Sequence, residues 1–353
     1  MSKCTLLSTG SIEGSVSLAR RDLALRIAVG ALLAGTSKFG TQYAFAASAG
    51  ATLTAEVYAR LKAASLVVML EGQMKGSGAL VDAGGLVITS AHGIGRKGSR
   101  VEVLTAAAER LRAEVVAVDL GHDLALLKLP TREADYPFLS LADQLPGFGT
   151  AIFCLAQPES LGAPILFRGL VTNENPTFVQ VLADYVPALA LEGTLPPGTS
   201  GGPWVDIQGR LVALQFGFLH MHNIPIGVAF ASPLGAIRQL LASRQHAKTP
   251  FTGMVISELW RQQPNSLRMF PPQTEGLFIV SVADNQPAAR AGLKPGDLIV
   301  EVESRPVRFR DEFLSKIRSK KPGDQLSVGL IEPGVPNKRE AMITLGLLET
   351  SWQ

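Results

Sequence analysis

Residues 198–205 read GTSGGPWV, a serine with glycines on both sides and an apolar segment directly after it. Glycine has no Cβ, so it lets a substrate carbonyl approach closely and lets the backbone turn its N–H groups outward. This pattern is typical of a nucleophilic hydroxyl, here Ser200, on a tight turn. The N–H groups along Gly198, Thr199 and Ser200 would form an oxyanion hole, with Gly198 and Ser200 as the donors. A glycine-rich hairpin turn without chemistry is the alternative.

A hydroxyl is a weak nucleophile at neutral pH, so it needs a histidine base that is oriented by a buried carboxylate. Residues 87–92 (VITSAH) form an apolar segment that ends in His92. Residues 121–129 (GHDLALLKL) place Asp123 at the mouth of another apolar segment. We therefore expect His92, Asp123 and Ser200 to act together as a catalytic triad.

These three segments resemble the TAAH, D[IL]AL and G[DN]SGGP motifs of chymotrypsin-like proteases, in the same chain order. They are most similar to those of the bacterial HtrA/Deg proteases, and residues 76–81 (GSGALV) match the hairpin that precedes the histidine strand in that family. The resemblance implies a mainly β fold with a double six-stranded β-barrel over residues 53–245, and a homotrimer. The dense run of short apolar segments with turn signals, without long helical patterns, also favours an all-β barrel.

The loop before the serine departs from the family pattern. Thr199 replaces the aspartate of digestive enzymes, so the ion pair between that aspartate and a newly cut N-terminus cannot form. Pro196 lacks an N–H and stiffens the loop. Two outcomes stay open: Pro196 locks the oxyanion turn in its active state, or it holds the turn in an inactive one.

We expect the substrate pocket to be lined by the strands that flank the loop after the nucleophile. Its walls are apolar and carry no acid, which favours small or medium aliphatic side chains in the substrate. The expected lining residues are Leu214, Gln215, Phe216, Gly217 and Gly227.

Other reactive side chains receive structural interpretations. His122 is interpreted as a solvent-facing bystander and Asp119 as a less favoured alternative acid. His220 and His222 lack a third partner at a usual metal-ligand spacing, so we expect a surface loop and no metal site. Cys154 lies in an apolar run and is expected in the core.

The C-terminal region carries a second motif. Residues 287–302 (PAARAGLKPGDLIVEV) predict a short helix that ends at Gly292, a turn, and an apolar strand. This run resembles the SPAxxAGLxxGDxI signature of bacterial PDZ domains, which implies a PDZ domain over residues 251–348. Such domains add a peptide strand to a sheet edge and bind its terminal carboxylate. The expected peptide-binding residues are Phe251, Thr252, Gly253, Met254, Phe313 and Ile317.

Residues 1–47 predict an export signal. Paired arginines at 20–21 precede an apolar run at 27–35, and small residues follow at 44–47. The segment resembles a cleaved twin-arginine signal, and an ordinary secretory signal or an uncleaved leader is the alternative. The run is too short to span a membrane, which takes about 20 residues. We expect an exported, periplasmic protein without a stable membrane span.

The chain has 353 residues, of which 46% are hydrophobic and 18% charged, so it can bury two or three compact units. Its net charge of +3 is not concentrated in a basic block, which argues against nucleic acid as a partner. No cofactor motif is present. The sequence predicts a serine endopeptidase for unfolded or exposed polypeptide segments, regulated by its PDZ domain in protein quality control. A protease-like scaffold with weak or no catalysis, acting in peptide binding or as a chaperone, is the alternative.

Overall fold

The structure is a computed structural model. It describes residues 51–353 except 174, 182–183, 222–223, 336 and 349–353. The expected export signal, residues 1–47, lies outside the described residues. Over the described part of the chain, no helix combines the length and apolar character needed to cross a bilayer.

The first barrel is preceded by a short helix, α2 (Ala55–Ala64). The hydroxyl of Thr54 accepts a hydrogen bond from the Val57 N–H, which caps the helix. Val57, Leu61 and Ala64 recur at helical spacing and are buried.

The first sheet is antiparallel, with the strand order β5-β4-β1-β2-β3-β7-β6. Its short strands β5 and β6 are separated only by Ala113, so they act as one bent strand that pairs with β4 at one end and β7 at the other. Because that strand joins the two ends of the order, the sheet curls into a barrel of six strands. Its strands are β1 (Ser65–Leu70), β2 (Gln73–Leu80), β3 (Leu86–Ser90), β4 (Val101–Leu104), β5 (Arg110–Arg112), β6 (Glu114–Asp119) and β7 (Leu124–Lys128).

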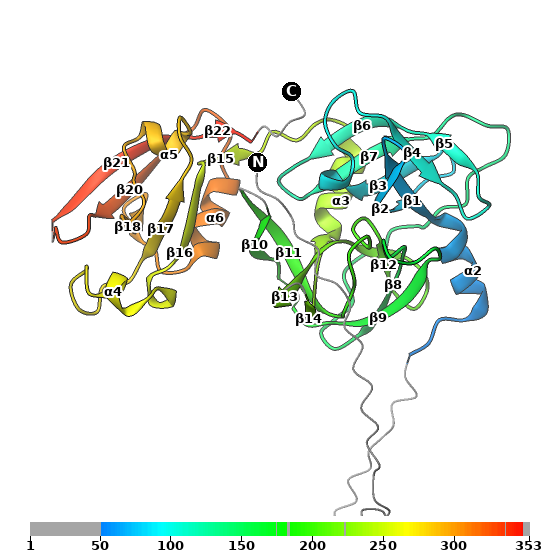
Figure 1. Cartoon of the computed structure of the whole chain (residues 1–353), viewed down its shortest axis with the longest axis horizontal. Helices are drawn as coiled ribbons and strands as arrows, with labels where there is room; N and C mark the ends of the chain where they lie inside the picture. Colours follow the sequence, from blue (N-terminus) through cyan, green and yellow to red (C-terminus); the bar gives the residue numbers. More distant parts are fainter. Residues whose placement is uncertain (1–50, 174, 182–183, 222–223, 336, 349–353) are drawn as a thin grey trace, which may run out of the picture. The chain divides into compact units, whose positions relative to one another are not determined.

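The second sheet has the order β10-β11-β14-β13-β12-β8-β9 and is closed by pairing of β11 with β9. The seventh strand, β10, lies outside the ring and forms a hairpin with β11. Figure 1 shows these strands in green and the first barrel in blue and cyan. The strands are β8 (Ala151–Ala156), β9 (Ile165–Val171), β10 (Thr177–Val181), β11 (Asp184–Glu192), β12 (Pro203–Val205), β13 (Leu211–Met221) and β14 (Ile224–Pro233). The expected double-barrel fold class is confirmed.

The helix α3 (Leu234–Ser243) follows the second barrel, and its apolar face packs into the core of the first. The core of the second barrel centres on Trp204, which is fully buried, as is the free thiol of Cys154. Burial raises the pKa of the Cys154 thiol far above its ordinary value, so this cysteine is an inert core residue.

The C-terminal region has its own sheet, in the order β16-β17-β18-β20-β21, and its own apolar core. Strand β16 is an edge strand that pairs only with β17 among the named strands. The elements are β15 (Pro250–Phe251), β16 (Met254–Glu258), α4 (Pro264–Leu267), β17 (Leu277–Val282), α5 (Pro287–Arg290), β18 (Leu298–Val302), β19 (Arg305–Pro306), α6 (Arg310–Arg318), β20 (Gln325–Ile331), β21 (Lys338–Thr344) and β22 (Gly346–Leu347).

Candidate active site

His92 lies in a short turn of 3-10 helix, Ala91–Gly93, at the end of the wholly buried strand β3. Ala91 and Gly93 are buried, while one third of the His92 side chain (33%) is exposed. The turn therefore delivers the imidazole from the barrel core to its surface. The ring Nδ1 lies 2.6 Å from Oδ2 of Asp123, and the His92 N–H donates to Oδ1 of the same carboxylate at 2.9 Å.

Asp123 lies in the turn between β6 and β7 and is almost completely buried. Its φ of +53° is in the left-handed region, which is unfavourable for a residue with a Cβ. The 3-10 turn after β3 supports this conformation, because the Ala91 N–H donates to the Asp123 carbonyl at 3.0 Å. The pairing of β3 with β7 thus brings histidine and acid together from segments about 30 residues apart.

The electrostatics favour a charged imidazole. Partial burial by itself lowers the pKa of His92, but the hydrogen bond and negative charge of Asp123 outweigh it, so the pKa is raised above the ordinary 6.5. With Nδ1–H donated to Asp123, the other ring nitrogen, Nε2, is the one left to accept a proton. This is the arrangement that a general base requires.

Ser200 lies on a turn that contacts both barrels. Its carbonyl accepts from the N–H of Ser77 on β2 at 2.7 Å, and the Gly201 N–H donates to Gln215 on β13 at 2.6 Å. Gly201 has a φ of +85°, and a Cβ there would lie 1.9 Å from the carbonyl oxygen of Ser77. Only glycine fits this position, which explains the first glycine after the serine.

The Ser200 hydroxyl donates to the carbonyl of Phe216 at 3.2 Å, and it makes no hydrogen bond to His92 in this structure. The two loops are nevertheless neighbours. Ser90, two residues before His92, donates from its hydroxyl to the carbonyl of Gln215, the same oxygen that accepts from Gly201. The structure therefore brings His92 and Asp123 into contact and Ser200 into the adjoining loop.

The turn of the expected oxyanion hole is held by its own backbone. Gly198 has a φ of +92°, and the Thr199 hydroxyl donates to the Pro196 carbonyl at 2.8 Å. The Gly202 N–H donates to the carbonyl of Thr199 at 3.0 Å. Within the described residues, the N–H groups of Gly198 and Ser200 have no protein acceptor.

The expected pocket residues differ in their exposure. Leu214 is fully buried in the core of the first barrel, so only its backbone can meet a substrate. Gln215 is also buried, with its amide bonded to the Trp204 indole N–H and the Gly217 carbonyl. The Phe216 ring stacks on Phe230, with ring centroids 6.5 Å apart. Gly227 has a φ of +81° and open space where a Cβ would be.

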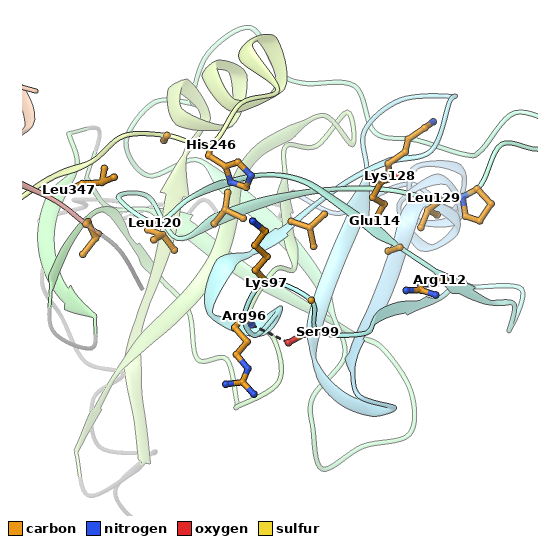
Figure 2. A pocket seen from close by; sticks show the side chains of 17 residues that line it. Arg96, Lys97, Ser99, Arg112, Glu114, Leu120, Lys128, Leu129, His246 and Leu347 are labelled. Atoms are coloured by element: carbon orange, nitrogen blue, oxygen red, sulfur yellow. Dashed lines mark hydrogen bonds between the residues drawn. The ribbon is translucent and has the colours of Figure 1, made fainter. Parts of the chain in front are cut away.

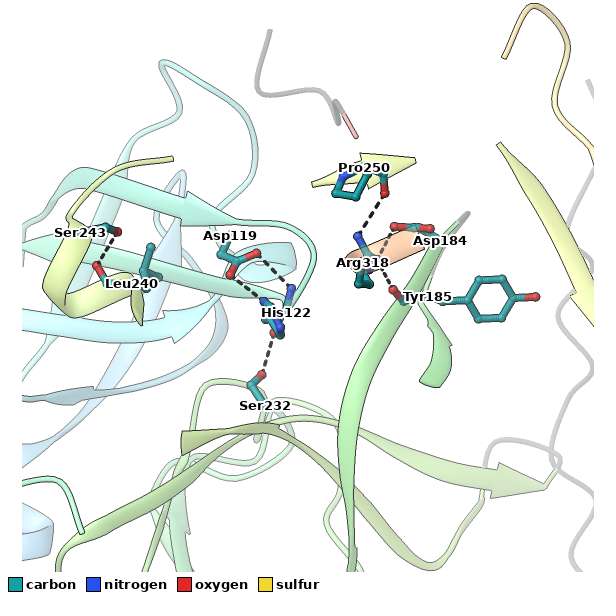
Figure 3. Close-up of polar contacts among 9 residues, drawn as sticks. All are labelled: Asp119, His122, Asp184, Tyr185, Ser232, Leu240, Ser243, Pro250 and Arg318. Carbon is teal, nitrogen blue, oxygen red and sulfur yellow. Dashed lines mark hydrogen bonds and ion pairs between the residues drawn. The ribbon is translucent and has the colours of Figure 1, made fainter. Parts of the chain in front are cut away.

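The interpretation of His122 as a solvent-facing bystander is wrong. Its ring Nδ1 lies 2.7 Å from Oδ2 of Asp119, its N–H donates to Oδ1 of Asp119, and its carbonyl accepts from the Ser232 hydroxyl at 2.8 Å (Figure 3). The only local signal of this pair is the spacing of His122, three residues after Asp119. Asp119 is the partner of His122, and Asp123 is the partner of His92.

His220 is exposed on β13, and His222 lies outside the described residues. Among the residues that the structure describes, no group of three or more His, Cys, Asp or Glu side chains is arranged to hold a metal ion.

A cavity of about 860 Å³ is lined by residues of the first barrel together with His246 of the linker and Leu347 of β22. Its rim carries the basic side chains of Arg96, Lys97, Arg112 and Lys128, and Leu120 and Leu129 contribute apolar surface (Figure 2). None of His92, Asp123 and Ser200 lines it, so this cavity is not the site of the expected chemistry.

The expected PDZ groove residues fall into two groups. Thr252 in the loop before β16 and Met254, the first residue of β16, are buried, and Gly253 between them has a φ of +75° with the Gln286 side chain where a Cβ would be. On α6, Phe313 and Ile317 are buried in the core of the domain. Phe251, partly buried, belongs to β15.

The edge of β16 that does not pair with β17 forms hydrogen bonds with the β10–β11 hairpin of the second barrel. The Tyr185 hydroxyl donates to the carbonyl of Ile256 at 2.8 Å and accepts from its N–H at 2.9 Å. Arg318 on α6 pairs with Asp184 at 2.9 Å and donates to the Tyr185 and Pro250 carbonyls (Figure 3). Burial raises the pKa of Asp184, and the charge of Arg318 partly offsets this. A peptide strand added at this edge would need the same groups of Ile256.

The model of the trypsin-like peptidase domain matches residues 76–214, and that of the PDZ domain matches residues 262–339. A probable periplasmic serine endoprotease, DegP-like, of Ectopseudomonas mendocina is 24% identical over 286 residues, which cover 80% of this chain and 58% of that protein. A protein of the same description from Halomonas elongata is 26% identical over 281 residues, 78% of this chain and 57% of its own length. The chain thus spans less than two thirds of the length of these relatives.

Solved structures agree on the fold. The HtrA-type protease AlgW with tripeptide superposes with a TM-score of 0.60 at 22% identity, covering 84% of this chain and 97% of that one. A serine endoprotease from Yersinia pestis gives a TM-score of 0.57 at 20% identity, covering 83% and 97%.

Fold and site together define a trypsin-like peptidase domain joined to a PDZ domain. Within that class, the relatives and solved structures confirm the resemblance to HtrA/Deg-type proteases that the sequence motifs indicate. The boundaries 53–245 and 251–348, and the roles of the individual site residues, stay predictions.

Proposed function

We propose that the chain is a serine endopeptidase that cleaves exposed segments of unfolded polypeptides. The observation that carries the proposal is the two-point contact of His92 with the buried Asp123 carboxylate, beside the loop of Ser200. A carboxylate that holds both the ring and the backbone of a histidine fixes its tautomer and its orientation. The names of the relatives, which describe serine endoproteases, support the same reaction.

In the proposed reaction, the Ser200 hydroxyl leaves the Phe216 carbonyl by rotation about its Cα–Cβ bond and donates to Nε2 of His92. Ser200 then attacks the scissile carbonyl as His92 takes its proton, and the Gly198 and Ser200 N–H groups stabilise the oxyanion. The imidazolium, stabilised by Asp123, gives the proton to the leaving amine. A water molecule then attacks the acyl-enzyme: His92 takes a proton from this water and gives it to the Ser200 oxygen as the acyl group leaves.

The remaining parts of the proposal follow from the resemblance and the relatives. The protein acts in the periplasm, where the relatives' names place those proteins. Its PDZ domain binds C-terminal or exposed peptide segments at the edge of β16, where the peptide replaces the Tyr185 hydroxyl on Ile256, and this binding tunes proteolysis in protein quality control. The protein assembles as a homotrimer through its peptidase domains.

Casein cleavage by purified wild type and by Ser200→Ala tests the proposed reaction. The wild type is expected to degrade casein, and the variant is expected to lose that activity while keeping its fold. Ser243→Ala, which alters a hydroxyl at the end of α3, is the matched control and should cleave like wild type. Equal cleavage by wild type and Ser200→Ala would contradict the proposal.

One observation favours a second function. Because Ser200 donates to Phe216 and not to His92, the chain can be a protease-shaped scaffold that binds peptides or acts as a chaperone. That function predicts no casein cleavage by the wild type, together with suppression of aggregation of an unfolded client protein. Cleavage that depends on Ser200 would exclude it.

A further inference from the structure

A second carboxylate–imidazole pair, which has no part in the proposed reaction, joins Asp119 at the end of β6 to His122 in the turn before β7. Asp119 is buried, and 29% of the His122 side chain is exposed. The pair repeats the geometry of the first one. In both pairs, one carboxylate oxygen accepts the backbone N–H of the histidine and the other contacts its Nδ1. The two pairs are interleaved in the chain, because His122 directly precedes Asp123.

The pair lies directly before Asp123, whose backbone conformation is unfavourable. Asp123 is held at a φ of +53°, and its carboxylate has to reach the ring and the backbone of His92 at the same time. A residue with a Cβ does not stay in the left-handed region without support from its surroundings. Some of that support has to act on the residue before Asp123, since the peptide between them sets the direction of the Asp123 side chain.

His122 is held on three sides, as Figure 3 shows. Its ring is fixed by Asp119 at 2.7 Å, its N–H by the same carboxylate at 3.2 Å, and its carbonyl by the Ser232 hydroxyl at 2.8 Å. Ser232 is fully buried on β14 of the second barrel. The carbonyl that accepts from Ser232 belongs to the same peptide as the N–H of Asp123. The second barrel therefore fixes the plane of the peptide that enters the catalytic acid.

The turn is also covered from outside. Gly121 is buried, and a Cβ at this position would lie 2.6 Å from the Thr249 hydroxyl and 3.3 Å from a guanidinium nitrogen of Arg318. Thr249 and Arg318 thus leave no space for the turn to move outward from the barrel. A loss of the contacts at His122 would therefore change the position of Asp123, the next residue.

We propose that His122, held by Asp119 and Ser232, is a positioning residue that keeps the carboxylate of Asp123 on His92. The inference rests on the proposed function, in which His92 is the base. His122 does not touch substrate. Its effect is transmitted through the peptide that it shares with Asp123.

The test compares three variants by steady-state kinetics on casein or a peptide substrate. His122→Ala removes the contact with Asp119, and Ser232→Ala removes the bond to the peptide. His122→Asn keeps a side-chain N–H that can donate to Asp119. A misplacement of about 1 Å at a catalytic group can cost on the order of 10²-fold in rate, so we expect kcat of His122→Ala to fall roughly 10- to 100-fold with KM nearly unchanged. Ser232→Ala should fall less, and His122→Asn should recover most of the activity.

His246→Ala is the matched control, because His246 is an exposed histidine in the linker after α3. It should leave kcat and KM at wild-type values. Wild-type kcat in both His122→Ala and Ser232→Ala would overturn the proposal. So would an equal loss in His122→Asn and His122→Ala, because a donor to Asp119 would then have no effect. If His122→Ala does not fold, Ser232→Ala and His122→Asn still decide the question.

Proton NMR separates failure of this inference from failure of the proposed function. The Nδ1 proton of His92, shared with Asp123 at 2.6 Å, should give a far-downfield resonance in the wild type. We expect this resonance to weaken or move upfield in His122→Ala and to return in His122→Asn, whether or not the protein cleaves casein. An unchanged resonance in His122→Ala contradicts the positioning role even if catalysis is demonstrated. Absence of wild-type cleavage with the expected resonance changes contradicts only the proposed function.

Discussion

The Asp123 carboxylate accepts two hydrogen bonds from His92, one from the ring and one from the backbone. Each bond is charge-assisted, and both lie in a nearly buried site where such bonds are strong. The carboxylate thus fixes the tautomer of the imidazole and also its direction. Because of this double contact, replacing one carboxylate oxygen of Asp123 should have a large effect on catalysis.

Asp123→Asn keeps the shape of the side chain and removes its charge. An amide in this place can donate to Nδ1 and stabilise the wrong tautomer, so we expect kcat/KM to fall by roughly 10⁴-fold. The measurement is the initial rate on a fluorogenic peptide. Asp143→Asn is the control, because the Asp143 side chain is 95% exposed, and it should behave as wild type. A loss of less than tenfold in Asp123→Asn would mean that the pair is structural and not catalytic.

The raised pKa of His92 sets the pH dependence. A general base acts in its neutral form, and burial lowers the pKa while the contact with Asp123 raises it by more. Activity should therefore rise with pH through a midpoint above 6.5. The profile of kcat/KM against pH measures this midpoint in the free enzyme. A midpoint below 6.5 would show that the contact with Asp123 does not dominate in solution.

At the scale of the elements, the nucleophile turn depends on glycine at position 201. A Cβ there would lie 1.9 Å from the Ser77 carbonyl oxygen at a φ that alanine avoids. We expect Gly201→Ala to lower the free energy of unfolding by more than about 2 kcal/mol, as measured by urea denaturation.

Gly235→Ala is the matched control in helix α3, where no atom outside its chain neighbours and the backbone of its own helix lies within 4 Å of the added methyl. Alanine is the better helix former, so this change should raise the free energy of unfolding by up to about 1 kcal/mol. If both substitutions shift the urea midpoint in the same direction, the strain argued for the nucleophile turn is absent.

The elements that could be predicted from the sequence are those with a local signal. The strands before His92 and after Asp123 are apolar runs bounded by turns, and Ser200 stands between glycines that the backbone requires. These signals depend on residues near one another in the chain, so they can be recognised without knowledge of the tertiary structure.

Other features depend on contacts between distant segments. His122 is anchored by Ser232, which is 110 residues away, and nothing in the local sequence signals that bond. Leu214 and Gln215 follow the nucleophile loop as expected, but the barrels bury both side chains. Tyr185 lies in an ordinary strand pattern, and its hydroxyl meets Ile256 only because the hairpin reaches the C-terminal domain.

At the scale of the whole molecule, that last contact joins the peptidase and PDZ domains. The Tyr185 hydroxyl is the protein partner of the Ile256 N–H on the β16 edge. Tyr185→Phe removes it, and a net hydrogen bond of about 1 kcal/mol predicts that the Ile256 amide exchanges with deuterium roughly 3- to 10-fold faster. Hydrogen exchange followed by NMR or mass spectrometry measures this rate.

Tyr136→Phe is the control for that measurement. Its hydroxyl donates to the Pro130 carbonyl within the first barrel, far along the chain from β16. This variant should leave exchange at Ile256 unchanged. An unaltered rate in Tyr185→Phe would mean that the hairpin does not hold the β16 edge in solution.

We propose that His92, Asp123 and Ser200 form one catalytic unit. Labelling with a fluorophosphonate probe tests it most directly, because the probe reacts with a serine hydroxyl only when a base activates it. We expect a single adduct that peptide mapping locates at Ser200 in the wild type, and no adduct in His92→Ala. Absence of an adduct on folded wild-type protein, or labelling of Ser200 that persists in His92→Ala, would contradict it.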